Sequence, residues 1–187
     1  MTRCVQPRRR LASALSIGAV TLWMAIVGPS VRASVVVPLS LVELTAAADL
    51  VALGTVEDVR TVQGPTGIER LVQVRLTSTW KGPEASVVYV RLAGGQLGRL
   101  ETRVPGVPNV DEGARVVWFL AAHPRGGYSV IGLHQGALAA AGAPDGTWRV
   151  LAPSRVANAR GAVSRVPRAV TDLEAEVRAL AGTEGAQ

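Results

Sequence analysis

The sequence predicts a mainly β fold: one small antiparallel barrel of five or six strands, with a short helix before it and another helix after it. Valine-rich segments follow one another between residues 50 and 152, and several alternate apolar with polar residues, as strands with one buried face do. Glycine and proline separate these segments, and no helical pattern lies between them. Consecutive strands without crossover helices pair mostly antiparallel. Such a sheet buries its apolar face in a barrel or a sandwich, and of these two we predict the barrel.

The first 33 residues are predicted to be an export signal peptide. Arginines at positions 3 and 8–10 precede the uncharged, mostly apolar run of residues 11–27, and small residues follow up to Ala33. We expect cleavage after Ala33, which would leave the chain secreted or periplasmic and without stable membrane insertion. The alternative is an uncleaved N-terminal membrane anchor over residues 11–27, because this run approaches the length that spans a bilayer. The arginines fit both the general secretory and the twin-arginine route.

The charge and cysteine content of the remaining chain exclude several classes of protein. Five of the 20 basic residues and none of the 14 acidic residues lie in residues 1–33, so residues 34–187 carry 15 basic against 14 acidic side chains. A nucleic-acid partner is therefore not expected on charge alone. The only cysteine is Cys4. Residues 34–187 can hold no disulfide, zinc–thiolate site or cysteine nucleophile, and their length suits a single domain.

The elements of the predicted barrel domain, residues 34–152, begin with a helix. Ser40 and Glu43 form an S-x-x-E capping box, which predicts a helix over residues 41–48. The alternation and the breakers then predict six strands, at residues 50–59, 70–80, 85–93, 114–122, 127–135 and 147–152.

The glycines of "AGGQLG", at positions 94, 95 and 98, raise the question of a phosphate-binding loop. Such a loop needs a helix directly after the glycines, because the helix N-terminus faces the phosphate. Here Pro105, Gly106 and Pro108 follow and exclude a helix. We therefore assign the three glycines to a hairpin or a bulge.

The C-terminal part of the chain changes in composition after residue 152. Residues 153–168 contain four arginines and no acidic residue, and we interpret them as a linker. A helix is predicted over residues 169–182, because Thr171 and Glu174 form a second capping box and Gly182 can end it. Its apolar face, expected to dock on the sheet, consists of Leu173, Val177 and Leu180. Residues 183–187 form a tail.

Ser129, His134 and Asp145 supply the residue types for nucleophilic catalysis, and two histidines, His123 and His134, are the candidates for metal binding. They lie on or beside neighbouring predicted strands, and Asp111, Glu112 or Asp145 could complete a site. No H-x-x-x-H pair and no G-x-S-x-G elbow is present. We therefore predict no catalytic residue, no metal ligand and no cofactor, and keep a metal-dependent or hydrolytic enzyme using the two histidines as an alternative.

The predicted contact surface combines aromatic and basic residues. Trp118 and Phe119 are neighbours on a predicted strand and point to opposite faces, so one of them is either exposed or covered by a terminal helix. The arginine-rich segment could bind an anionic polymer or a membrane surface. Its other interpretation is a solvated linker that the acidic residues of the segment 169–187 partly neutralise. The predicted surface residues are Trp118, Phe119, Arg155, Arg160 and Arg165.

Residues 48–138 resemble a group of uncharacterised exported bacterial proteins. The motifs that carry this resemblance are "AADLVALGTVEDV", "TSTWKGPEASVVYVRLAGG", "VPGVPNVDEGARVVWFLAA" and "GLHQGAL". The resemblance implies a small OB-type or netrin-like β-barrel, and some members of the group accompany secreted metalloproteases. Netrin-like inhibitors of metalloproteases present a cysteine at the mature amino terminus, where this chain would present Ser34.

These observations predict a non-catalytic binding or accessory module of the cell envelope or medium, which engages another secreted protein. Two alternatives remain: an enzyme using His123 or His134, and an OB-like domain that binds glycan or nucleic acid through residues 155–168. Neither the ligand nor the oligomeric state follows from the sequence.

Overall fold

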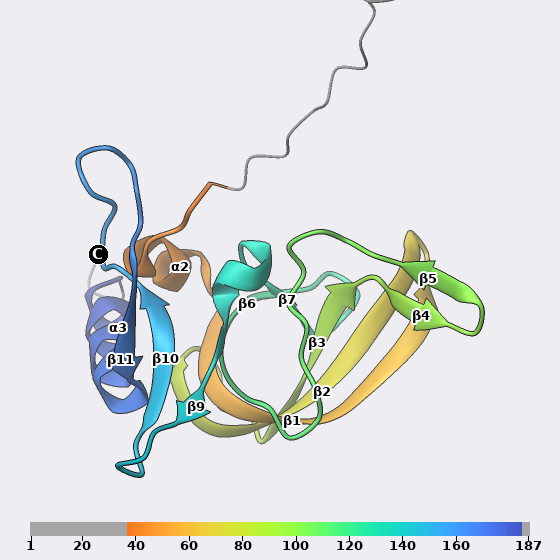
Figure 1. Cartoon of the computed structure of the whole chain (residues 1–187), viewed down its shortest axis with the longest axis horizontal. Coiled ribbons are helices and arrows are strands. Elements are labelled where there is room, and N and C mark those ends of the chain that lie inside the picture. The colour runs from red at the N-terminus through yellow and green to blue at the C-terminus, as the bar shows by residue number, and fades with distance from the viewer. Residues whose placement is uncertain (1–36, 185–187) are drawn as a thin grey trace, which may run out of the picture. The chain divides into compact units, whose positions relative to one another are not determined.

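Five strands close a ring in the computed structural model, which describes residues 37–184 (Figure 1). The strands are β1 (Leu50–Gly64), β2 (Gly67–Lys81), β3 (Val87–Ala93), β6 (Arg115–Ala122) and β7 (Tyr128–Val130). They pair in the order β1-β2-β3-β7-β6, and β6 pairs with β1 again. A sixth strand, β8 (Ala137–Ala139), extends the sheet beside β6. The predicted mainly β fold with an OB-like barrel is confirmed.

The predicted signal peptide, residues 1–33, and the alternative anchor, residues 11–27, lie outside the described residues. The last three residues of the predicted tail, 185–187, do so too. No helix within residues 37–184 has the length and apolar character that a membrane crossing needs.

The ring contains one parallel pair, between β3 and β7. All other strand pairs of this sheet are antiparallel. The strand predicted over residues 127–135 is shorter than expected, since β7 ends at Val130 and a 3-10 helix, η1 (Leu133–Gly136), follows. Gly132 and Leu133 both have φ of 60°, and this left-handed backbone ends the extended segment.

The first two strands are longer than predicted and strongly bent. β1 and β2 pair up to Gly64 opposite Gly67, and the register shifts at three places along β1. One shift adjoins Gly54, where a Cβ atom would lie 2.5 Å from Val74 Cγ1 and 2.8 Å from the Arg75 carbonyl oxygen. A bulge with a glycine lets the two backbones approach closely and curves the strand into the ring.

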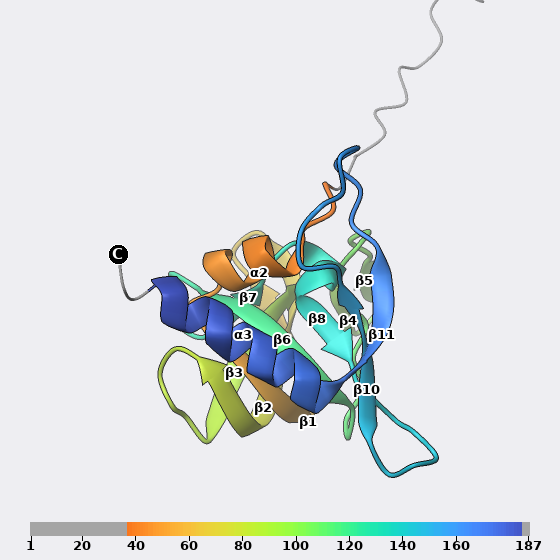
Figure 2. The same cartoon turned by 90° about the vertical axis from the view of Figure 1, so that its left-hand side faces the viewer.

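The core has two parts, one on each side of β1 and β6. The barrel interior contains Leu50, Val56, Val72, Val74, Val90 and Trp118. On the other side, two helices and a small sheet cover Leu53, Val117 and Phe119. Figure 2 shows the helices in front of β6. Burial on both faces explains why β6 is almost entirely apolar.

The leading helix, α2 (Leu41–Ala47), begins as the capping box predicts. The Ser40 hydroxyl accepts a hydrogen bond from Glu43 N, and the Ser40 N–H donates to the Glu43 carboxylate at 2.8 Å. Lys81 Nζ donates to the Thr45 carbonyl at 2.8 Å, at the other end of the helix. Side chains thus cap backbone groups at both ends of the helix.

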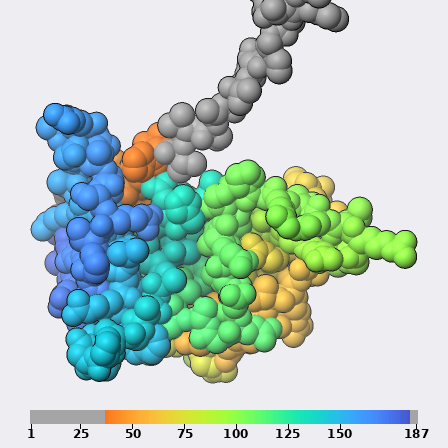
Figure 3. Space-filling view, viewed as in Figure 1, coloured from red at the N-terminus to blue at the C-terminus, as the bar shows by residue number. Residues whose placement is uncertain are grey.

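The glycines of residues 94–98 form the predicted hairpin. Two short strands, β4 (Gly95–Leu97) and β5 (Leu100–Thr102), pair antiparallel, and no helix follows them. Gly94 has φ of 83°, and a Cβ there would lie 2.6 Å from the Thr102 carbonyl oxygen. The hairpin projects from the barrel in the space-filling view, drawn in green (Figure 3). Its residues Leu97 and Leu100 are exposed.

The C-terminal part differs from the prediction in two ways. Residues 165–168, assigned to a linker, belong to strand β11 (Arg165–Ala169), which pairs with β10 (Trp148–Pro153). The free edge of β10 offers backbone hydrogen bonds that outweigh the weak strand pattern of this segment. On its other side β10 pairs with β9 (Ala141–Gly142).

The second difference concerns the last helix, α3 (Val170–Glu184). It begins before Thr171, so the predicted second capping box is wrong, and it continues past Gly182. Glu174 instead accepts hydrogen bonds from Ser78 and Arg178. The predicted apolar face does dock: Leu173 and Val177 are fully buried in the outer core, and Leu180 packs against it.

Candidate functional site

A pocket lies where the barrel wall opens between β3 and β7. These two strands pair only through Val90 with Tyr128 and Arg91 with Ser129. Past this point β3 continues to Ala93, whereas the chain leaves the sheet after Val130. The opening holds a pocket of about 350 Å³, to which residues of the segment 102–108 also contribute. The pocket therefore exists because the parallel strands β3 and β7 pair over only two residues.

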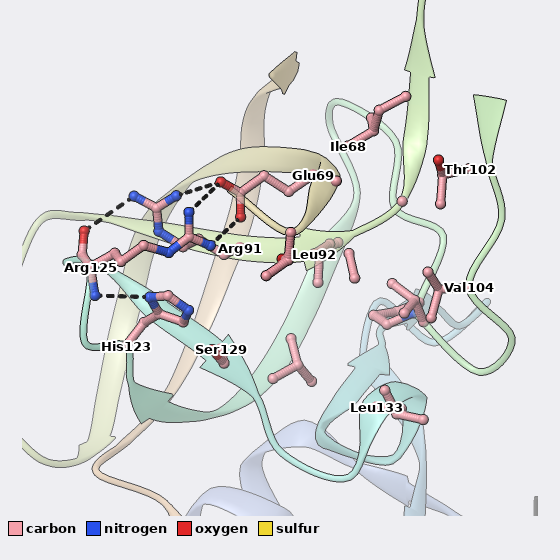
Figure 4. A pocket seen from close by; sticks show the side chains of 17 residues that line it. Ile68, Glu69, Arg91, Leu92, Thr102, Val104, His123, Arg125, Ser129 and Leu133 are labelled. Atoms are coloured by element: carbon pink, nitrogen blue, oxygen red, sulfur yellow. Dashed lines mark hydrogen bonds and ion pairs between the residues drawn. The ribbon is translucent and has the colours of Figure 1, made fainter. Parts of the chain in front are cut away.

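Glu69, Arg91 and Arg125 form the charged end of the pocket (Figure 4). The Glu69 carboxylate accepts three hydrogen bonds: from Arg91 Nη1 at 3.0 Å and from Arg125 Nη1 and Nη2 at 3.1 and 2.8 Å. The side chain of Glu69 is 11% exposed, that of Arg91 20% and that of Arg125 38%. Partial burial and charge-assisted hydrogen bonds give this cluster a fixed geometry.

Arg91 also fixes the loop that carries Arg125. Its Nε donates to the Gly126 carbonyl at 3.0 Å and its Nη2 to the Arg125 carbonyl at 3.2 Å. Within the loop, His123 Nδ1 accepts a hydrogen bond of 3.1 Å from Arg125 N. The loop between β6 and β7 is therefore tied to β3, so Arg125 is positioned before any ligand arrives.

The charged end has more donors than acceptors. Each guanidinium has five N–H groups. Three of Arg91 and two of Arg125 donate in the bonds described above, and the other five have no partner among the described residues. The two arginines and Glu69 together carry a formal charge of +1. Both the donors and the charge favour an anionic ligand.

The opposite end of the pocket is apolar. Leu92 points into the barrel core, and Val130 packs against the same cluster. Val107 and Leu133 complete this end, and Figure 4 shows Leu133 far from the charged side chains. Because neighbouring residues of a strand point to opposite faces, Arg91 lies on the outer side while Leu92 lies on the inner side. The pocket therefore passes from a charged end on the outer side of β3 to an apolar end.

Leu133 has an unusual backbone. It is the only residue other than glycine with a positive φ in the described part of the chain, and it lines the pocket. Such a conformation costs on the order of 1 kcal/mol for a residue with a β-carbon. The neighbouring His134 N–H donates to the Gly106 carbonyl at 2.8 Å, which holds this turn against the segment that borders the pocket.

The structure separates the residues predicted for metal binding or hydrolysis. His123 lines the pocket, but His134 lies in η1 and is not a lining residue. Asp145 lies in the turn after β9, where hydrogen bonds from the hydroxyl and N–H of Thr147 lower its pKa. Within residues 37–184 no three His, Cys, Asp or Glu side chains are grouped to hold a metal ion.

Trp118 and Phe119 do not form a contact surface. Both side chains are fully buried, Trp118 in the barrel interior and Phe119 under the helices. They do point to opposite faces, as predicted, and a terminal helix covers the outer one. The prediction that one of them contacts a partner is wrong, because β6 has no solvent-exposed face at this position.

The predicted basic surface residues lie outside the pocket. Arg155 and Arg168 both pair with Glu176 of α3, at 3.9 and 2.5 Å. Arg165 Nη1 lies 3.4 Å from the Leu151 carbonyl, and Arg160 is exposed in the loop between β10 and β11. Neutralisation by the acidic C-terminal part is thus confirmed for two of the four arginines.

The three charged residues of the pocket were not predicted from the sequence. Arg125 lies between a histidine and two glycines in "HPRGG", and Glu69 follows the turn "GPTG". Charged residues beside such turns are the local feature that could have indicated a binding site. The pairing of the strands into a ring is what brings the two turns together at the opening between β3 and β7, and this pairing cannot be read from the local sequence.

A comparison with protein-family models finds no matching family, and a comparison with curated proteins finds no matching relative. The fold and the site define this chain as a small OB-type barrel with a preformed, positively charged pocket at an opening of its wall. Its resemblance to exported bacterial proteins stays a prediction.

Proposed function

We propose that this chain is an exported, non-catalytic binding or accessory module that engages another secreted protein through the pocket between β3 and β7. The preformed cluster of Glu69, Arg91 and Arg125 is the observation that carries the proposal. Glu69 accepts three hydrogen bonds from two arginines, so it serves as a counter-ion that holds their guanidiniums in place.

The position of the pocket supports binding. OB-type barrels bind ligands on the face of strands two and three, between the loop joining the first two strands and the loop joining the last two. Here the lining residues include Thr66 and Gly67, at the turn between β1 and β2, and His123 and Arg125, between β6 and β7. The pocket volume falls at the lower end of the range of about 300–1,000 Å³ for ligand sites. It suits a small group or one chain end.

A comparison of two arginine variants tests this function. The full chain is expressed in cells that export it, purified as released, immobilised, and incubated with the proteins that the same cells export. Arg125→Gln removes a charge from the pocket, and Arg160→Gln removes one from the predicted basic surface. We expect Arg125→Gln to weaken retention of the partner at least about tenfold, while Arg160→Gln retains it as well as the unchanged protein does.

The opposite pattern would move the contact site to residues 155–168 and overturn the proposal. Circular dichroism of both variants checks that the fold is intact. A salt titration then separates the two sites further, because binding to an anionic polymer through several arginines must weaken steeply as salt rises.

The hydrolytic alternative has one observation in its favour, because His123 and Ser129 both line the pocket. His123→Ala and His134→Ala distinguish it from a binding function. If the protein turns over a hydrolase substrate and His123→Ala abolishes this activity, the chain is an enzyme and the proposed binding function is wrong.

A further inference from the structure

We infer that the pocket between β3 and β7 recognises the C-terminal carboxylate of a partner polypeptide whose last residue is aliphatic. This inference rests on the proposed binding function and names the part of the partner that the pocket takes. Charge, lining chemistry and the free edge of a strand support it.

The charge of the pocket matches one negative charge. Two guanidiniums and one carboxylate leave a formal +1, and five N–H donors remain without a partner among the described residues. A carboxylate brings one negative charge and two acceptor oxygens, which Arg side chains bind well. A phosphate monoester brings about −1.5 to −2. The fixed Glu69 thus favours a carboxylate over a phosphate.

The lining of the pocket favours an aliphatic group beside that charge. Ile68, Leu92, Val107, Val130 and Leu133 provide branched aliphatic surface, and no Trp, Tyr or Phe lines the pocket. Bases and sugars are usually held by stacking on aromatic rings. A nucleotide or a glycan would find no such ring here, whereas an aliphatic side chain would replace water on the apolar end.

The free edge of β3 favours a polypeptide over a small acid. After Arg91, no strand of the described chain pairs with the β3 edge that faces the opening. On its other edge β3 stays paired with β2 as far as Ala93. An extended peptide can add to such an edge through its backbone, and the side chains then enter neighbouring pockets. A small aliphatic acid shares the carboxylate chemistry but gains nothing from this edge.

Short peptides with a fluorescent label at the amino end test the inference by fluorescence anisotropy. The probe is fluorescein–Gly-Ala-Ala-Val with a free carboxylate, and its matched control is the same peptide as a C-terminal amide. We expect the amide to bind at least about tenfold more weakly, since it loses the charge that the arginines recognise. Isovalerate should compete only at concentrations at least about tenfold above those of the unlabelled peptide, and inorganic phosphate should compete more weakly still.

Variants place the binding in the pocket. Arg125→Gln should lower the affinity for the free-acid probe at least about tenfold. Arg99→Gln, in the exposed turn of the β4–β5 hairpin, should leave this affinity unchanged. Leu133→Gly should lower the affinity for the probe while the charge of the pocket stays the same. It serves as a second pocket variant should Arg125→Gln disturb the loop.

The outcomes separate this inference from the proposed function. Equal affinity for acid and amide, or phosphate competing better than the peptide, would overturn carboxylate recognition even if partner capture still depends on Arg125. If Arg125→Gln no longer binds the probe but still captures the partner, the proposed function is wrong, while the inference that the pocket binds carboxylates stands. Absence of any binding by the free-acid probe would overturn the inference outright.

Discussion

Glu69 and Arg125, 56 positions apart in the chain, are joined by two hydrogen bonds of 3.1 and 2.8 Å at the opening of the barrel. Both Glu69 oxygens are used, and Arg91 donates to one of them as well. This geometry fixes the loop between β6 and β7 against β2 and β3. The same contact therefore stabilises the barrel and positions the donors of the pocket.

Glu69→Gln should lower the free energy of unfolding and change the ligand preference together. The side chain of Glu69 is mostly buried, and its loss leaves two guanidiniums without their counter-ion. Because Arg125 is more than a third exposed, we expect the free energy of unfolding to fall by about 1–3 kcal/mol. This is less than the roughly 3–5 kcal/mol that is lost when a fully buried ion pair is broken. Urea unfolding followed by tryptophan fluorescence measures it.

In the same variant the two guanidiniums have no carboxylate beside them, so the formal charge of the pocket rises to about +2. Phosphate should then compete with the free-acid peptide better than it does in the unchanged protein. Glu57→Gln is the matched control, since Glu57 binds Gln73 and Arg75 on the outer side of the sheet away from the pocket. An equal effect of both variants on stability and on competition would contradict the role assigned to Glu69.

Much of the barrel can be predicted from the sequence, because the patterns that indicate its elements involve residues close together in the chain. Alternation along β2, the capping box at Ser40 and the breakers after Gly98 each depend on neighbouring residues, and each prediction is confirmed. The errors occur where tertiary contacts decide. β11 forms because β10 offers an edge, and β7 stops early because the chain turns at Gly132 to meet the segment at Gly106.

The pocket residues could not be predicted for a related reason. Glu69, Arg91 and Arg125 come from two strands and a loop, and no local pattern links them. Their meeting depends on the register of β2 with β3 and on the parallel pairing of β3 with β7. The aromatic residues of β6 were predicted to form a contact surface instead, but both are buried because both faces of that strand are covered.

Ser40→Ala should destabilise the chain by about 1 kcal/mol, because the start of α2 loses its side-chain cap. The effect should depend on pH. Hydrogen bonds from the Ser40 hydroxyl and backbone lower the pKa of Glu43. A carboxyl whose pKa is lowered by folding stabilises the fold above the ordinary glutamate pKa of about 4.3, and this stabilisation is lost as the pH falls through the lower pKa of the folded state.

Urea unfolding of both proteins at several pH values below neutrality tests this prediction. The unchanged protein should lose stability more steeply on acidification than Ser40→Ala does, so the difference between them should shrink. A difference that stays constant from pH 7 to about pH 3, well below the ordinary glutamate pKa, would show that the Ser40 hydroxyl and not the ionised Glu43 carries the cap.

Gly54→Ala and Gly182→Ala should have opposite effects on stability. A β-carbon at Gly54 would lie 2.8 Å from the Arg75 carbonyl oxygen, which belongs to a paired strand and cannot move freely. We expect a loss of about 1–3 kcal/mol from this overpacking. At Gly182, inside α3, a β-carbon meets no atom within 4 Å, so alanine should raise stability by up to about 1 kcal/mol. Thermal unfolding of both variants compares them, and a loss at Gly182 as large as that at Gly54 would contradict this account.

Leu133→Gly should separate stability from binding. Glycine relieves the left-handed backbone at this position, which offsets the loss of a side chain that is 37% exposed. We therefore expect the free energy of unfolding to change by less than about 1 kcal/mol. The apolar end of the pocket loses one of its walls, so a peptide ending in valine should bind several-fold more weakly, whereas one ending in glycine should be little affected. Unfolding curves and anisotropy titrations of the same preparation measure both quantities. A large loss of stability with unchanged binding would show that Leu133 serves only the packing of η1 against Gly106.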